Sequence, residues 1–347
     1  MYIDTSGLNH RIEELSTRRK YHFVDQKPAH YKHGRTPTLL CVHGFPDCWY
    51  GWRYQIKPWV HRGFRVVVPD MLGYGGTDKP KNPVEYSTKS LCADLAAILD
   101  LLEIKKAVLI GHDWGAYAVS RPPSLEYISV KTIAKIAPNL SYQAYFEEQR
   151  STQEIESNLN TFLRVIYRNP NPTQRFKISQ LYKGPEVLAK IYVPDSDIVL
   201  NSEELKFYNK IFEQGMNGPL NYYRTSLYRH EEELAAKLSP NLRQDLPVLF
   251  IWGTKDTTTT SSLIHKAHKF IPRLQDFALE EKGHWILVEA RDVITEKIAQ
   301  WLEDLAIEAR MAAKVHLPSC PCCRTKVRNL NRGLAKHKAI FGNTCMP

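Results

Sequence analysis

The sequence predicts an α/β fold with a mostly parallel, doubly wound sheet and an inserted helical segment. Short apolar runs alternate with helical patterns through much of the chain, which is typical of parallel strands joined by crossover helices. One apolar run ends in a tight corner, where an aspartate lies between small residues. The middle of the chain, about residues 139–239, lacks this alternation and is rich in Tyr, Asn, Gln and Pro. We interpret this middle segment as a helical cap inserted above the strand ends, where open α/β sheets bind ligands.

The expected strands are short, and two of the expected helices have a clear apolar face. We expect strands at residues 39–42, 65–70, 107–110 and 248–253. Ser87 is a candidate N-cap for the first helix. Apolar residues spaced three or four apart mark both helices: Leu91, Leu95, Ile98, Leu99 and Leu102 in the first, and Ile294, Ile298, Trp301, Leu302 and Leu305 in the last.

The corner after the third expected strand indicates covalent catalysis. Its sequence is Gly111-His112-Asp113-Trp114-Gly115, and small residues on both sides of a nucleophile permit the sharp turn of a nucleophile elbow. The nucleophile here is an aspartate, whose carboxylate attacks an electrophilic sp³ carbon and itself becomes the acyl half of an ester. The leaving group would be an epoxide oxygen or a halide.

Partners for this nucleophile follow in the expected chain order. Asp256 lies in the loop after the strand at 248–253, and His284 follows Gly283 further along. The order nucleophile, acid, histidine is that of the elbow motif, so His284 would activate water while Asp256 orients it. An oxyanion hole would use the backbone N–H groups of Phe45 and Trp114.

At these motifs the chain resembles the epoxide hydrolases of the α/β-hydrolase fold, in particular the soluble fungal and plant type. The resemblance covers roughly residues 10 to 305 and includes His43-Gly44-Phe45-Pro46 and Gly73-Tyr74-Gly75-Gly76-Thr77-Asp78-Lys79-Pro80. It implies two cap-domain tyrosines that hold and protonate the epoxide oxygen. Ser141-Tyr142-Gln143-Ala144-Tyr145-Phe146 and Asn221-Tyr222-Tyr223-Arg224 point to Tyr142 and Tyr223. With Trp114, these two residues are expected to bind the substrate.

The expected reaction is hydrolysis of a small-molecule epoxide to a vicinal diol, which needs no cofactor. A dehalogenase with the same Asp-His-Asp residues is an alternative, although halide release favours indole or amide donors over paired phenols. The other alternative is a non-catalytic, damaged hydrolase.

The segment after the elbow favours that last alternative. Only eight residues, 114–121, separate Asp113 from Pro122-Pro123, and consecutive prolines end a helix. Relatives have a fuller helix and a whole strand before the equivalent prolines. We therefore expect that about 20 to 30 residues are missing near 118–123, judged from an ordinary helix, strand and two connections. Alternatively, residues 128–137 could form an irregular replacement strand.

These observations divide the chain into four parts. Residues 1–138 would form the first part of the catalytic core, 139–239 a helical cap, and 240–310 the second part of the core. Residues 311–347 would be a basic, disordered tail. Its seven Lys and Arg residues, without any Asp or Glu, reduce the net charge of +10 to +3 for the rest of the chain. We expect no nucleic-acid partner, since such a charge run is usually solvated.

The cysteines and the apolar runs bear on location and metal binding. Seven dispersed cysteines argue for a reducing compartment, and no run approaches the roughly 18 apolar residues of a membrane span. We therefore expect a cytoplasmic protein without a membrane partner. A weaker alternative for the tail is a zinc site made by Cys320, Cys323, His337 and Cys345.

Overall fold

A computed structural model describes residues 5–120, 126–171, 178–183, 187–239 and 241–315. Their strands form two sheets, one of five strands in the order β1-β2-β4-β3-β5 and one made of β6 and β7. The strands span His10–Glu14 (β1), Lys20–Gln26 (β2), Thr38–Val42 (β3), Arg65–Pro69 (β4), Val108–Gly111 (β5), Val248–Gly253 (β6) and Leu274–Leu279 (β7). Pairing is parallel from β4 through β3 to β5 and between β6 and β7, and antiparallel where β1 and β2 join the edge. The predicted α/β fold and the four expected strands are confirmed.

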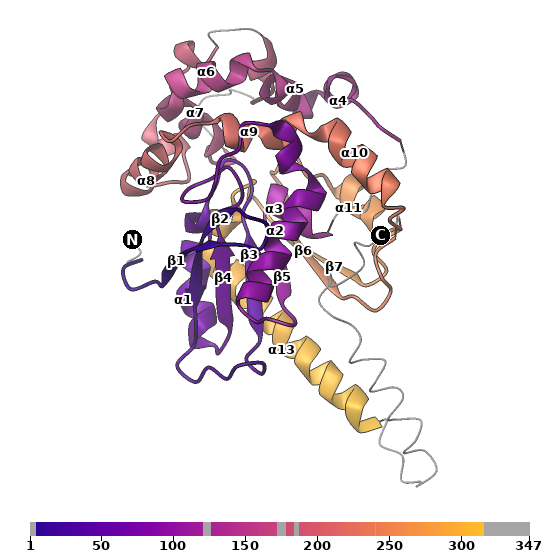
Figure 1. The fold of residues 1–347 in the computed structure, drawn as a ribbon. Coiled ribbons are helices and arrows are strands. Elements are labelled where there is room, and N and C mark those ends of the chain that lie inside the picture. Colours follow the sequence, from indigo (N-terminus) through magenta and orange to yellow (C-terminus); the bar gives the residue numbers. More distant parts are fainter. Residues whose placement is uncertain (1–4, 121–125, 172–177, 184–186, 240, 316–347) are drawn as a thin grey trace.

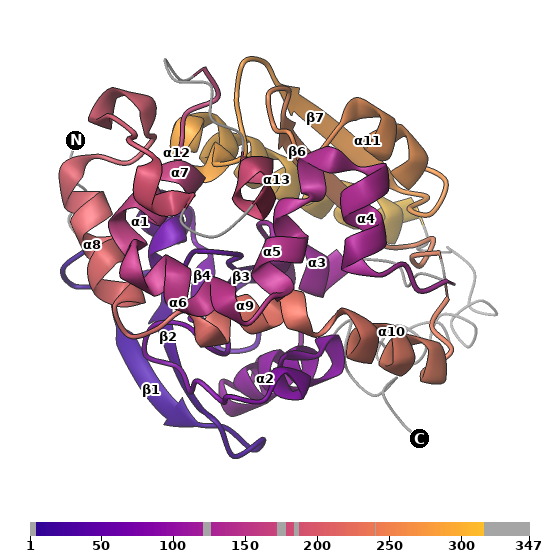
Figure 2. The ribbon, with the colours of Figure 1, turned by 90° about the horizontal axis from the view of Figure 1, so that it is seen from above.

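Helices cover both faces of the five-stranded sheet. Seen from above, α2 lies on one side of the strands, while α1 and α13 lie on the other (Figure 2). The expected N-cap is confirmed, because the Ser87 hydroxyl accepts a hydrogen bond from the backbone N–H of Ser90. On the opposite face, the Trp59 indole donates to the carbonyl of Thr295 at 3.0 Å. The helices on the two faces span Arg53–His61 (α1), Thr88–Leu101 (α2) and Arg291–Val315 (α13). A further helix, which follows β5, spans Trp114–Ser120 (α3).

A second layer of helices lies above the carboxyl ends of the strands (Figure 1). Its main elements are α5 (Tyr142–Glu147), α6 (Arg150–Ser157), α7 (Leu159–Ile166), α8 (Ser202–Phe212), α9 (Asn217–Arg224) and α10 (Ser226–Ala235). Buried polar contacts attach this upper helical layer to the loop after β3. Tyr167 donates to the carbonyl of Pro46 at 2.6 Å, and Tyr208 donates to Asp47 at 2.7 Å. The layer is therefore held directly over the loop that follows β3.

The two sheets are not hydrogen-bonded to each other in the described residues. There, β5 pairs only with β3, and β6 pairs only with β7. Whereas β3 and β4 are wholly buried, the residues of β5 are all partly exposed. The replacement strand considered for residues 128–137 is wrong, because Val130–Ile136 forms helix α4, capped by Ser129. The missing helix and strand stay a prediction.

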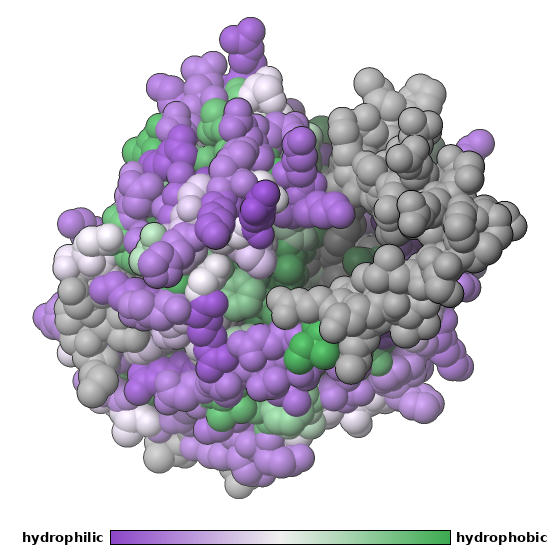
Figure 3. Space-filling view, turned by 90° about the horizontal axis from the view of Figure 1, so that it is seen from below, coloured by the Kyte–Doolittle hydropathy of each residue, from purple (hydrophilic) through white to green (hydrophobic). Residues whose placement is uncertain are grey.

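Two further findings concern the surface. Among the residues described, no helix is both long and apolar enough to span a membrane. Seen from below, the molecule is hollowed near its centre, and hydrophobic residues are visible in the hollow (Figure 3).

Candidate active site

The predicted elbow is a strained turn between β5 and α3. Asp113 has a φ of 52°, in the left-handed region that L-residues adopt at a cost. A Cβ at Gly115 would lie 2.1 Å from the carbonyl oxygen of Val42, and one at Gly111 would lie 2.4 Å from the backbone nitrogen of Ala116. The small residues are therefore required by close backbone approach, and the turn presents Asp113 at the carboxyl end of the sheet.

The loop after β3 brings a backbone donor to this aspartate. The N–H of Phe45 donates to Oδ1 of Asp113 at 2.7 Å. A Cβ at Gly44 would lie 2.4 Å from the Cβ of Asp113, so only glycine allows this approach. His43 holds the loop in place, since its Nδ1 donates to the carbonyl of Gly44 and its Nε2 accepts from the N–H of Met71, both at 2.9 Å. Phe45 therefore presents a backbone donor to the Asp113 carboxylate.

The structure brings Asp113, His284 and Asp256 together. Nε2 of His284 lies 3.7 Å from Oδ2 of Asp113, and its Nδ1 lies 3.0 Å from Oδ2 of Asp256. Burial lowers the pKa of His284, but the charges of Asp256 and Asp113 and the bond to Asp256 outweigh it and raise that pKa to about 9. In the resting site the imidazole is therefore protonated at neutral pH.

Asp256 is held in place by its own loop. Its Oδ1 accepts hydrogen bonds from the backbone N–H and the hydroxyl of Thr258, both at 2.7 Å. Burial raises the pKa of Asp256, but the charge of His284 and these hydrogen bonds outweigh it and lower the pKa to about 2. Asp256 is therefore an anion that fixes the ring orientation of His284.

The two tyrosines named from the sequence lie in the upper helical layer, on α5 and α9. Tyr142 and Tyr223 are both buried, and both line a cavity of about 550 Å³ that also contains Phe45, Asp113 and His284. Burial and, next, the charge of Asp113 raise the pKa of each phenol. Both phenols therefore keep their protons at neutral pH and can donate hydrogen bonds.

Trp114 begins helix α3 directly after Asp113. Its ring packs edge-on against Tyr223, with 5.1 Å between centroids. It therefore forms part of the wall beside Asp113. The donation of its N–H to an oxyanion stays a prediction.

Sequence reasoning missed Glu289, which positions the loop around His284. Both oxygens of the Glu289 carboxylate accept backbone N–H groups beside it, from Gly283 at 2.7 Å and Trp285 at 2.9 Å. Nε2 of His112 binds the carbonyl of His284 at 2.9 Å. No local sequence pattern around Glu289 predicts these hydrogen bonds, because the loop around His284 closes only when the chain folds.

The suggested zinc ligands Cys320, Cys323, His337 and Cys345 lie outside the described residues. Within the part of the chain that is described, no cluster of three or more His, Cys, Asp or Glu side chains could hold a metal ion.

The chain is similar to known proteins in sequence and in structure. A family model described as "alpha/beta hydrolase fold" matches residues 37–290. The chain is 28% identical over 319 residues to bifunctional epoxide hydrolase 2 of Mus musculus, covering 85% of this chain but only 56% of the relative. It thus spans about half the length of that relative.

Two other relatives match over nearly their whole length. The epoxide hydrolase srdG of Neurospora crassa is 28% identical and covers 86% of this chain and 96% of its own. Among solved structures, an epoxide hydrolase from an endophytic Streptomyces superposes with a TM-score of 0.73 at 28% identity, covering 87% of this chain and 97% of its own.

Proposed function

Because this chain belongs to the α/β-hydrolase fold family, we propose that its site hydrolyses epoxides to vicinal diols through a covalent ester on Asp113. One observation carries the proposal: the elbow carboxylate and the His284–Asp256 pair line the same cavity as two protonated phenols. The epoxide hydrolases among its relatives support the same substrate class. In this proposal residues 139–239 act as a cap, while 1–138 and 240–310 form the catalytic core.

The first step is ring opening. Oδ1 of Asp113 is bound by the N–H of Phe45, which leaves Oδ2 as the freer nucleophile. Oδ2 attacks one epoxide carbon, the carbon–oxygen bond breaks, and a proton from Tyr142 or Tyr223 passes to the departing oxygen. The product is a hydroxyalkyl ester of Asp113.

Ester formation then changes the state of His284. The charge of Asp113 is one of the causes that raise the pKa of His284 to about 9, and esterification removes that charge. The pKa of His284 therefore falls, the imidazolium passes its proton to the phenolate that ring opening left on Tyr142 or Tyr223, and the neutral imidazole can then take a proton from water. Hydroxide attacks the ester carbonyl, and the oxyanion forms at the oxygen that already faces Phe45, with Trp114 as the second donor. Collapse breaks the ester bond, and the departing alkoxide takes the proton that the attacking hydroxide carried, which releases the diol and regenerates the Asp113 carboxylate.

A product assay tests this function. Styrene oxide and 1-chlorohexane are offered separately to the chain and to a variant with about 25 residues of helix and strand inserted after Tyr117. We expect the inserted variant to form a diol from styrene oxide and no hexanol from 1-chlorohexane, whether or not the unmodified chain is active. Asp113→Asn should abolish diol formation. Asp100→Asn, which changes an exposed aspartate on α2, should leave diol formation unchanged. Hexanol without diol would indicate a dehalogenase, and no product from either protein would indicate a non-catalytic remnant.

A further inference from the structure

The loop after β3 carries the backbone donor that reaches the elbow carboxylate. We call residues 43–48 the donor loop; in it, the N–H of Phe45 donates to Oδ1 of Asp113 at 2.7 Å. Tyr167, which directly follows α7, donates from its hydroxyl to the carbonyl of Pro46 at 2.6 Å. Tyr167 is fully buried, so this hydrogen bond is shielded from water. The residue next to the donor is therefore held by the upper helical layer.

A second phenol of that layer holds the next residue of the donor loop. Tyr208 on α8 donates to Oδ1 of Asp47 at 2.7 Å, and the same oxygen accepts the N–H of Cys48 at 2.8 Å. Burial raises the pKa of Asp47 to about 6, although both hydrogen bonds lower it, so the side chain is a carboxylate at about pH 8. Its hydrogen bond to Tyr208 is then charge-assisted and stronger than a neutral one.

Tyr167 also contacts the loop that carries the base. Its ring stacks on Trp285, with 4.0 Å between centroids and 22° between the planes, and Trp285 directly follows His284. The indole of Trp285 donates to the carbonyl of Ile166, the residue before Tyr167, at 2.7 Å. One side chain of the upper helical layer thus joins the donor loop to the loop of His284.

The proposed reaction makes different demands on the Phe45 N–H in its two steps. In ring opening, the carboxylate of Asp113 loses charge as the ester forms, so a hydrogen bond to its Oδ1 does not favour this step. In ester hydrolysis, negative charge grows on the same oxygen, and a donor already fixed beside it stabilises the transition state. Displacing this donor should therefore slow hydrolysis without slowing ring opening.

We propose that Tyr167 and Tyr208 are positioning residues for ester hydrolysis, because together they hold the donor loop so that the Phe45 N–H stays on Oδ1 of Asp113. Tyr167 in addition fixes this loop relative to the loop of His284. The inference rests on the proposed ester of Asp113. It makes the upper helical layer necessary for the second step of the reaction as well as for the first.

The test separates the two steps in variants that each lose one hydroxyl. Tyr167→Phe and Tyr208→Phe are made in the full chain and again in the variant with a helix and strand inserted after Tyr117. Each protein, in excess over styrene oxide, is followed by rapid quenching and mass spectrometry of the Asp113 peptide at about pH 8, where Asp47 is ionised. We expect ester formation to change by less than about threefold and ester hydrolysis to slow by about tenfold or more, since loss of an oxyanion donor outright costs about 10²–10³.

Matched variants distinguish positioning from a general loss of packing. Tyr145→Phe also removes a buried hydroxyl from the upper helical layer, but this one is bonded to Glu154 at 2.9 Å, within the layer, so both rates should stay unchanged. Asp47→Asn keeps an oxygen that can accept from Tyr208 and should retain most of the hydrolysis rate. Asp47→Ala loses that oxygen and should slow hydrolysis as Tyr208→Phe does.

Hydrogen exchange of the same proteins gives a measurement that needs no turnover. Peptides covering residues 43–48 should exchange faster in Tyr167→Phe and Tyr208→Phe than in the parent, while exchange in residues 38–42 of β3 stays unchanged. Tyr145→Phe should exchange like the parent in both segments.

Three results would overturn the proposal. The first is equal slowing of ester formation and hydrolysis, which a merely structural role would cause. The second is normal hydrolysis in both phenylalanine variants, and the third is unchanged exchange in residues 43–48. If no protein forms the ester, the proposed function itself is refuted and the role in hydrolysis with it; that result differs from the first two, in which the parent forms and hydrolyses the ester.

Discussion

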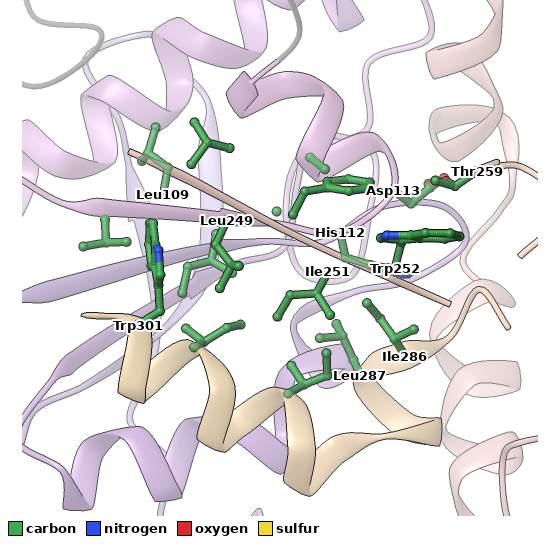
Figure 4. Close-up of a pocket in the computed structure, with 18 of the residues that line it drawn as sticks. Leu109, His112, Asp113, Leu249, Ile251, Trp252, Thr259, Ile286, Leu287 and Trp301 are labelled. Carbon is green, nitrogen blue, oxygen red and sulfur yellow. The ribbon is translucent and has the colours of Figure 1, made fainter. Parts of the chain in front are cut away.

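Restoring a covalently linked helix and strand after Tyr117 should convert the chain into a cooperatively folded protein. The magnitude follows from a cavity of about 500 Å³ between β5 and β6, which is lined by residues 107–111 and 248–253 (Figure 4). At about 24 cal/mol per Å³ of closed cavity, it corresponds to at most about 12 kcal/mol, the same order as the entire 5–15 kcal/mol of net stability of an ordinary domain. We therefore expect the unmodified chain to be poorly soluble or partly unfolded, with little activity.

Circular dichroism during heating measures this effect. The variant with about 25 inserted residues, an amphipathic helix followed by a β-branched strand, should melt sharply, and a Gly/Ser insert of equal length should not. A sharp transition of the unmodified chain above about 45 °C, as in ordinary mesophilic domains, would refute the reasoning. The cavity between β5 and β6 would then not destabilise the chain.

The other predictions concern the inserted variant. His284→Gln should allow alkylation but block hydrolysis, so that intact mass rises by the mass of one substrate on Asp113; normal multiple turnover would remove His284 from the mechanism. Tyr142→Phe and Tyr223→Phe should each slow ring opening, by roughly 10²–10⁴ for the residue that is the acid, and an unchanged rate in the double variant would exclude both phenols. The pKa of His284 is raised from 6.5 to about 9 by folding, so its contribution to stability is full below pH 6.5 and is lost as pH rises through about 9. The melting-temperature advantage over His284→Gln should therefore decrease across that window.

Local pattern was enough to predict the elements that present the candidate site. The elbow could be recognised because the neighbouring backbone leaves no room for a side chain at Gly111 and Gly115. The two glycines are visible in the sequence itself. The chain order of Asp113, Asp256 and His284 follows from the same topology, and the structure brings them together. The Ser87 cap was likewise local.

What could not be predicted depends on contacts between distant segments. Glu289 accepts two N–H groups that become its neighbours only when the loop around His284 closes. The attachment of the upper helical layer through Tyr208 and Asp47 joins residues 161 positions apart. The short connection after the elbow suggested that a strand is missing, but the cavity between β5 and β6 could be found only in the structure.

The most direct test of the covalent mechanism is a single turnover in ¹⁸O-labelled water with enzyme in excess over epoxide. Water attacks the ester carbonyl of Asp113 in the proposed second step, so the label should enter the Asp113 carboxylate, and peptide mass spectrometry should find it on the fragment that contains this residue. The diol from that first turnover should carry no label. Label in the diol, with an unlabelled Asp113, would mean that water opens the epoxide directly and would contradict the covalent mechanism.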